Sequence, residues 1–185
     1  MQQTPHILCI CGKPASGKST FRKMLKELGW NTLETSEIIA EMLATKNVRE
    51  LTGLEQARYR KSALELVSGP RPQALSNELL LRISKMNRPI VISGIRNVST
   101  LFDLSETGVD LIILFMDTSY LTCIDRFVAR GGERAGYQNL MSDPIESEWP
   151  KIYDRSNERV PNNGSIDELR KRANALHNKF FPLCA

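Results

Sequence analysis

Short apolar runs punctuate this chain and predict its strands. Residues 6–11 form one such run before a glycine-rich turn, and residues 111–116 form a second that is apolar throughout. Continuous runs of this kind are typical of strands that are covered on both faces. Weaker runs at residues 30–33 and 89–92 predict two further strands.

Between these runs, apolar residues recur at the spacing of amphipathic helices. Phe21, Met24, Leu25 and Leu28 follow the first strand at this spacing, and Gly29 is expected to end their helix. Strands that alternate with helices predict an α/β fold with a parallel sheet. Further helices are predicted near residues 38–43, 49–67, 75–86, 119–130 and 165–176, and a mobile glycine-rich loop is predicted at residues 131–142.

Composition agrees with one globular domain spanning residues 1–185. The sequence is 41% hydrophobic and 25% charged, and no apolar run reaches the roughly 18–20 residues that cross a membrane. The start of the chain lacks the pattern of a secretory signal, so we expect a cytoplasmic location. A net charge of +4 without clustered basic residues predicts no nucleic-acid polymer and no membrane as partner. The sequence does not indicate an oligomeric state.

One loop carries the strongest chemical signal. Residues 12–19, Gly-Lys-Pro-Ala-Ser-Gly-Lys-Ser, satisfy the pattern G-x-x-x-x-G-K-[ST] at every fixed position. In such a P-loop the backbone N–H groups surround phosphates, the lysine contacts the β- and γ-phosphates and the final hydroxyl binds Mg²⁺. The cofactors implied are therefore ATP and Mg²⁺. The predicted nucleotide-binding residues are Gly12, Ala15, Ser16, Gly17, Lys18, Ser19 and Thr20, with Ser19 as the metal ligand.

Phosphoryl transfer also needs cations that close over the phosphates. Arg126 and Arg130 are one helical turn apart, and Arg134 follows at the same spacing in the predicted loop. We expect a lid at about residues 126–148 that brings these arginines over ATP and excludes water. A solvated basic face is the alternative interpretation of the same spacing.

A second candidate position follows the predicted strand at residues 89–92. Gly94 and Arg96 come where the carboxyl end of a parallel strand opens into the ligand crevice. Arg96 is predicted to hold an acceptor phosphate through two parallel hydrogen bonds. An exposed arginine in a structural turn is the alternative.

Several segments resemble the nucleoside monophosphate kinase superfamily, within it the branch of dephospho-CoA kinases and deoxynucleoside monophosphate kinases. Residues 93–96 (Ser-Gly-Ile-Arg) stand where that branch often has Asp-Gly-Ile-Arg. Residues 163–169 (Asn-Gly-Ser-Ile-Asp-Glu-Leu) are similar to the segment that leads from its last strand into its final helix. Together with the P-loop, the resemblance covers most of the chain.

The resemblance implies a three-layer α/β/α P-loop kinase fold with about five parallel strands and a helical acceptor-binding insert near residues 36–87. Glu34 resembles the acidic residue that faces the acceptor hydroxyl, and it is predicted to orient or deprotonate that group. Arg58 and Arg71 are predicted to join Arg96 in binding the acceptor. Ser93 departs from the pattern, because it stands where that branch often has an aspartate. In the family that aspartate helps to organise Mg²⁺, so metal binding here is expected to depend more on Ser19.

Three functions compete on this basis. The leading one is transfer of the γ-phosphate of ATP to a (deoxy)nucleoside monophosphate or a dephospho-CoA-like nucleotide. The second is a kinase for a non-nucleotide metabolite. The third is an ATP-binding regulatory module with little transfer, which the serine at position 93 keeps open.

Overall fold

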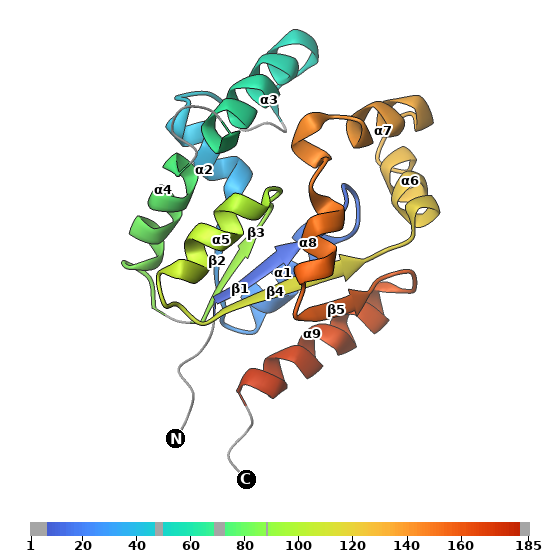
Figure 1. Ribbon diagram of the computed structural model, residues 1–185. Helices are drawn as coiled ribbons and strands as arrows, with labels where there is room; N and C mark the ends of the chain where they lie inside the picture. Colours follow the sequence, from blue (N-terminus) through green and yellow to red (C-terminus); the bar gives the residue numbers. More distant parts are fainter. Residues whose placement is uncertain (1–6, 47–49, 69–72, 88, 182–185) are drawn as a thin grey trace.

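Five parallel strands form the middle layer of the structure, a computed structural model that describes residues 7–46, 50–68, 73–87 and 89–181 (Figure 1). Their order in the sheet is β2-β3-β1-β4-β5, so the strand that leads into the P-loop is central. This arrangement confirms the predicted α/β fold. The strands are β1 (Ile7–Cys11), β2 (Asn31–Glu34), β3 (Ile90–Ser93), β4 (Leu111–Asp117) and β5 (Glu158–Pro161).

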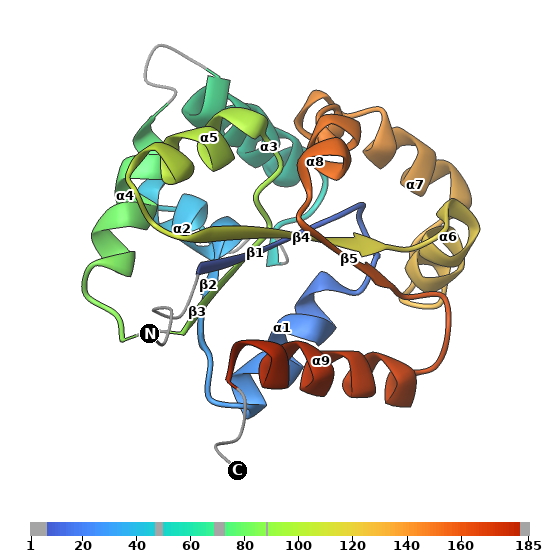
Figure 2. The same cartoon turned by 60° about the horizontal axis from the view of Figure 1, so that its bottom comes forward.

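Helices cover both faces of this sheet, as Figure 2 shows. Helices α1 and α9 lie against one face, and α2 to α5 together with α8 lie against the other. No helix in the described part of the chain is long and apolar enough to cross a membrane. The helices are α1 (Lys18–Glu27), α2 (Thr35–Met42), α3 (Gly53–Ser68), α4 (Ala74–Ile83), α5 (Val98–Glu106), α6 (Tyr120–Val128), α7 (Arg134–Met141), α8 (Trp149–Arg155) and α9 (Ile166–Phe180).

Strand β1 shows why its run is apolar throughout. Its side chains alternate between the two faces of the sheet. Ile7, Cys9 and Cys11 pack into the core beneath α2 to α5 and α8, while Leu8 and Ile10 pack toward α1 and α9. All five are completely buried, so a polar side chain anywhere along the strand would be buried in one of two cores.

The structure corrects one predicted loop and adds helices. The predicted mobile loop at residues 131–142 contains α7, because Tyr137 buries its whole ring against Phe127 and Met141. Helices α5 and α8 were not predicted from the sequence. The last helix is confirmed, and Ser165 and Glu168 form a reciprocal capping box at its start.

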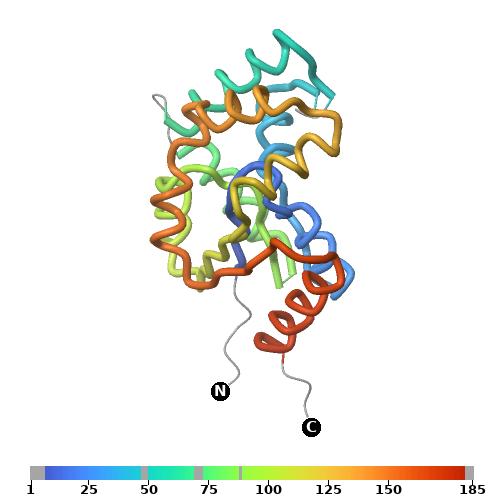
Figure 3. Tube along the Cα trace, turned by 90° about the vertical axis from the view of Figure 1, so that its right-hand side faces the viewer, coloured from blue at the N-terminus to red at the C-terminus, as the bar shows by residue number. Residues whose placement is uncertain are grey.

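The segments proposed as the acceptor-binding insert and the lid lie beyond the carboxyl ends of the strands (Figures 1 and 3). Helix α3, within the proposed insert at residues 36–87, stands on one side of this edge. The proposed lid at residues 126–148 holds the end of α6, helix α7 and a short 3-10 helix, η2 (Pro144–Glu146), on the other. In open parallel sheets this edge is where ligands bind.

Candidate active site

The P-loop follows β1 directly and turns into α1. Gly17 has a φ of 99° at the N-cap of α1, and a Cβ atom there would lie 2.2 Å from Asn162 Nδ2. Only glycine fits this conformation and this space. Ala15 also has a positive φ, 60°, which is uncommon for a residue with a side chain. Positive φ angles of this kind are what a P-loop needs to turn its N–H groups toward a phosphate.

Lys18 lies inside this loop. Its Nζ donates to the carbonyl oxygens of Gly12 at 2.6 Å and Lys13 at 2.7 Å. Removal from water, with the positive charge of Arg96 as the second cause, lowers the pKa of Lys18 to about 8. A triphosphate beside this ammonium would favour its charged form and raise its pKa, so the position favours an anionic ligand.

Ser16 provides a further test of whether the loop fits ATP. Its hydroxyl is buried, and among the described residues it has no hydrogen-bond partner, which is unusual for a buried polar atom. Its carbonyl oxygen is fixed by Thr118 Oγ1 at 2.9 Å and by Asn162 Nδ2 at 2.8 Å. An unsatisfied buried hydroxyl in a loop whose backbone is held in this way fits a phosphate oxygen, so the residues present suit ATP.

Neighbouring side chains hold the loop from the lid side. Tyr137 of α7 donates its hydroxyl to the carbonyl oxygen of Pro14 at 3.1 Å. Lys13 places its ammonium 5.1 Å from the centre of the Trp149 ring, a cation–π contact with the start of α8. The P-loop is thus in contact with two helices that sequence analysis did not predict.

Two cavities meet at this loop. The larger, about 930 Å³, extends toward α2, α3 and β3, and the smaller, about 430 Å³, extends toward α6 and the start of α9. Both are lined by Ala15, Lys18, Ser19 and Arg130. The Lys18 ammonium and the Ser19 hydroxyl therefore stand where the contents of one cavity would meet those of the other.

The predicted lid arginines separate into two groups. Arg126 and Arg130 line the smaller cavity, and Arg130 also lines the larger one. Arg126 Nη1 is buried and lacks a partner among the described residues. Arg134 instead begins α7 and pairs with Asp125 at 3.0 Å on an exposed surface. The structure thus places two of the three arginines beside the P-loop.

Glu34 lies at the end of β2, in the wall of the larger cavity. It is 7% exposed, and Ser93 Oγ donates to its Oε2 at 2.7 Å. Arg22 adds an ion pair at 3.4 Å to the same oxygen. Glu34 and Ser93 are register partners on neighbouring strands, so the serine that departs from the family pattern binds a carboxylate from the next strand.

Gly94 makes this arrangement possible. Its φ is 93°, and a Cβ atom there would lie 2.5 Å from Glu34 Oε1 and from Thr35 Oγ1. In the described part of the chain no three His, Cys, Asp or Glu side chains form a metal-binding group. A magnesium ion here would therefore depend on the Ser19 hydroxyl and the phosphates, with Glu34 in the wall of the same cavity.

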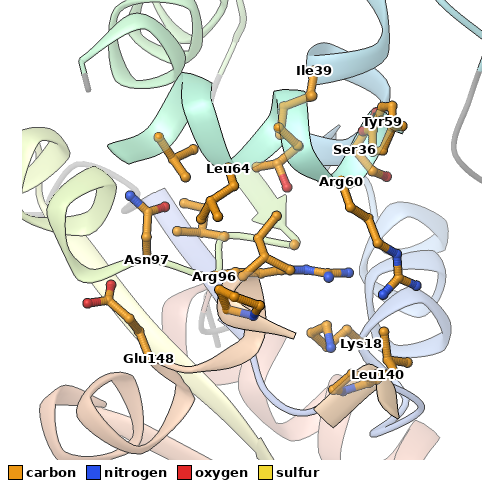
Figure 4. A pocket seen from close by; sticks show the side chains of 18 of the residues that line it. Lys18, Ser36, Ile39, Tyr59, Arg60, Leu64, Arg96, Asn97, Leu140 and Glu148 are labelled. Carbon is orange, nitrogen blue, oxygen red and sulfur yellow. Dashed lines mark hydrogen bonds between the residues drawn. The ribbon is translucent and has the colours of Figure 1, made fainter. Parts of the chain in front are cut away.

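The acceptor-side arginines differ from the prediction. Arg96 lines the larger cavity as expected, and in Figure 4 its guanidinium points toward Arg60 and Lys18. Arg58 is exposed on α3 and does not line either cavity, whereas Arg60 does. Arg71 lies outside the described residues.

The spacing of apolar residues along α3 indicates that Arg60 faces the cavity. It shares a helix face with Ala63, Leu64 and Val67, which are three, four and seven residues further on and all line the cavity. Arg60 and Arg96 each have an acidic partner from the lid: Arg60 Nη1 lies 3.0 Å from Asp143 Oδ2, and Arg96 Nη1 binds Glu146 Oε1. Sequence analysis did not identify these two acids.

Comparisons with known proteins support the fold. The sequence matches no protein-family profile and no curated protein. Among solved structures, TT1252 from Thermus thermophilus is 20% identical with a TM-score of 0.60, covering 96% of this chain and 98% of that one. Shikimate kinase from Bacteroides thetaiotaomicron is 14% identical with a TM-score of 0.61, covering 96% and 99%. Shikimate kinase from Acinetobacter baumannii, solved with shikimate, is 13% identical with a TM-score of 0.61, covering 97% and 94%.

These similarities establish the P-loop kinase fold that the sequence predicted. They extend over nearly the whole of each chain. Two of these neighbours are shikimate kinases, so the likeness to dephospho-CoA kinases stays a prediction from the sequence.

Proposed function

We propose that this chain is an ATP-dependent phosphotransferase that moves the γ-phosphate of ATP to a hydroxyl group of a small acceptor. The observation that carries the proposal is the shared boundary of the two cavities at Lys18 and Ser19. The smaller cavity, along the start of α1 and α9, suits the nucleoside of ATP. The larger one then receives the acceptor, opposite the phosphates. A module that only binds ATP would not need this second, larger cavity.

The donor side of the mechanism follows from the loop. Its N–H groups and Lys18 would bind the β- and γ-phosphates, and Ser19 would be the protein ligand of Mg²⁺. When bound, Mg·ATP supplies the transferable phosphoryl group and neutralises part of its charge. Arg126 and Arg130 come from the lid side, where they would stabilise the negative charge that develops during transfer.

The acceptor side depends on Glu34. Its carboxylate would accept the proton of the acceptor hydroxyl while that oxygen bonds to the γ-phosphorus. The bond between the γ-phosphorus and the bridging oxygen breaks, and ADP departs with the electron pair. Contacts from Ser93 and Arg22 fix the carboxylate, so it is positioned before the acceptor arrives.

Two acceptor classes fit this reaction. The resemblance of residues 93–96 to nucleotide kinases favours a (deoxy)nucleoside monophosphate or a dephospho-CoA-like nucleotide. The fold neighbours favour a non-nucleotide metabolite, since one of them is a shikimate kinase solved with shikimate. A cytoplasmic location suits either reaction, because both consume ATP.

An acceptor panel tests the proposal. ATP consumption is measured by coupled assay with nucleosides, nucleotides and hydroxy acids as acceptors, for the wild type, Lys18→Ala and Glu34→Gln. We expect acceptor-dependent turnover that falls by at least about 100-fold in each variant, within the range for a lost charge-stabilising or acid–base group. Tight Mg·ATP binding with no acceptor-stimulated turnover would instead support the regulatory module and refute the kinase.

A further inference from the structure

Two arginines that line the acceptor cavity, Arg60 and Arg96, are already matched by acids of the protein. Arg60 lines the cavity from α3 and Arg96 from the turn after β3, and the guanidinium of Arg96 points toward Arg60 (Figure 4). Asp143 binds Arg60 and Glu146 binds Arg96, both from the short segment that precedes α8. Each of these two arginines, which could bind an acceptor phosphate, therefore has a carboxylate beside it.

Glu146 is the more constrained of the two acids. Its side chain is 2% exposed, whereas Arg96 is 39% exposed on its side chain. A buried carboxylate without its partner is strongly unfavourable. An acceptor phosphate could reach Arg96 only by separating this pair or by adding two negative charges next to a buried third. Both routes weaken phosphate binding.

Two further acids in the cavity wall also disfavour binding of an acceptor phosphate. Glu34 lies in the cavity wall at the proposed transfer site, and Glu148 lies near Asn97 on the side away from Lys18 (Figure 4). Glu148 Oε2 accepts the N–H of Val98 at 2.7 Å, so it occupies the amino end of α5, a position that would otherwise attract an anion. These acids oppose a doubly charged ligand at Arg60 and Arg96, whereas the other cations of the cavity, Lys18 and Arg130, lie at its boundary with the smaller cavity, where the triphosphate of ATP would bind.

The far end of the same cavity is apolar. Side chains from α2, α3, α4 and the turn after β3 line it: Ile39, Ala63, Leu64, Val67, Leu75 and Ile95. An apolar wall of this kind binds the aromatic or aliphatic body of a ligand by removing it from water. The cavity thus combines a carboxylate at the transfer site with an apolar far end.

From these observations we propose that the acceptor is a hydroxyl compound with an apolar or aromatic body and no phosphate group, and that Glu146 and Asp143 determine this specificity. The inference rests on the proposed kinase function. It selects, within that function, a nucleoside-like or other phosphate-free acceptor over a nucleoside monophosphate. Glu146 acts through Arg96, and Asp143 acts through Arg60.

The test measures phosphate binding with the donor site filled. Wild type, Glu146→Gln and Asp143→Asn are loaded with Mg²⁺ and a non-hydrolysable ATP analogue, and inorganic phosphate and thymidine monophosphate are titrated by calorimetry. Removing one negative charge near Arg96 or Arg60 is expected to tighten binding of both probes by about tenfold or more. Glutamine at position 146 keeps an acceptor oxygen for Arg96, and melting curves verify that each variant is folded.

Glu133→Gln is the matched control, because Glu133 is an exposed acid in the same lid segment. It should bind both probes as the wild type does. Equal phosphate affinity in the wild type and in both acid variants would overturn the proposal, whether that affinity is high or undetectable. Turnover adds a second criterion: the wild type should prefer thymidine to thymidine monophosphate, and a reversed preference would also overturn it.

The outcomes separate this inference from the function on which it rests. If the ATP analogue binds and phosphate binds the wild type as tightly as the acid variants, only the acceptor class is wrong. If the analogue does not bind the wild type, and Lys18→Ala behaves identically, the kinase itself is refuted and the inference fails with it.

Discussion

We predict that Lys18 makes nucleotide binding sensitive to pH in a range where the charge of ATP itself is constant. Burial lowers the pKa of this lysine to about 8, with Arg96 as the second cause. The β- and γ-phosphates need the charged ammonium, so deprotonation should weaken binding. Phosphate groups have their second pKa at about 6, so above a pH of about 7.5 their own charge is nearly constant.

The size of the effect follows from this pKa. A lysine with a pKa of about 8 is roughly nine-tenths protonated at pH 7 and roughly one-tenth at pH 9. If only the protonated form binds, affinity falls about tenfold between these values and about tenfold for each further pH unit. A lysine that keeps its ordinary pKa of 10.5 would cause almost no change over the same range.

The assay is a fluorescent-nucleotide titration from about pH 7 to about pH 9.5 at constant ionic strength. Lys18→Arg is the control, because arginine stays charged throughout this range. Its affinity should be lower than that of the wild type at pH 7 but flat with pH. A flat profile for the wild type, or an equal decline for Lys18→Arg, would refute the assignment of the titration to Lys18.

Three further substitutions test the geometry of the site. Gly94→Ala should lower stability by about 1–2 kcal/mol through its positive φ and should lower kcat, because the new methyl displaces the Glu34 carboxylate; thermal melting and steady-state kinetics measure the two effects. Ser93→Asp replaces a hydrogen bond to Glu34 by like-charge contact, so it should destabilise the fold by about 1–3 kcal/mol and shift the acid limb of the pH–rate profile upward. Tyr137→Phe removes only the hydroxyl that binds the Pro14 carbonyl oxygen, and it should weaken ATP binding severalfold in a nucleotide titration.

The chain offers matched controls for these variants. Gly29 has nearly the same φ as Gly94, 91°, and a Cβ atom added there would have no atom within 4 Å. Gly29→Ala therefore measures the backbone strain alone, without displacement of Glu34. Tyr120→Phe removes a hydroxyl from the tyrosine whose ring packs against Tyr137. Equal losses of kcat in both glycine variants, or of ATP affinity in both tyrosine variants, would contradict these explanations. For Ser93→Asp, unchanged stability and an unchanged pH–rate profile would show that Glu34 is misplaced.

The elements that local sequence determines were predictable. The P-loop pattern, the apolar run of β1 and the capping box of Ser165 and Glu168 each depend on residues close together in the chain. Helix α7 was missed because Gly136, the preceding pair Gly131 and Gly132, and the polar residues of this segment disfavour regular structure. Its stability comes from tertiary burial of Tyr137, which local propensity does not report.

The acceptor site was predictable only in part. Glu34 ends β2 and Arg96 closely follows β3, so both could be placed at the carboxyl edge of a parallel sheet. Glu146 lies fifty residues beyond Arg96, and no spacing rule connects them. Ion pairs between distant segments become visible only when the fold brings them together, and here they place acids beside two of the arginines of the cavity.

The contact between Lys13 and Trp149 should make the fluorescence of Trp149 sensitive to nucleotide binding. The sequence has two tryptophans, and the other, Trp30, packs edge-on against Phe180 and Phe181 and donates its ring N–H to His177. A triphosphate in the loop would draw the Lys13 ammonium from the indole of Trp149 and change its emission, while Trp30 remains in its aromatic cluster. Replacing Trp30 by phenylalanine would leave a single fluorophore beside the phosphates, suited to stopped-flow measurement of nucleotide arrival without any attached dye.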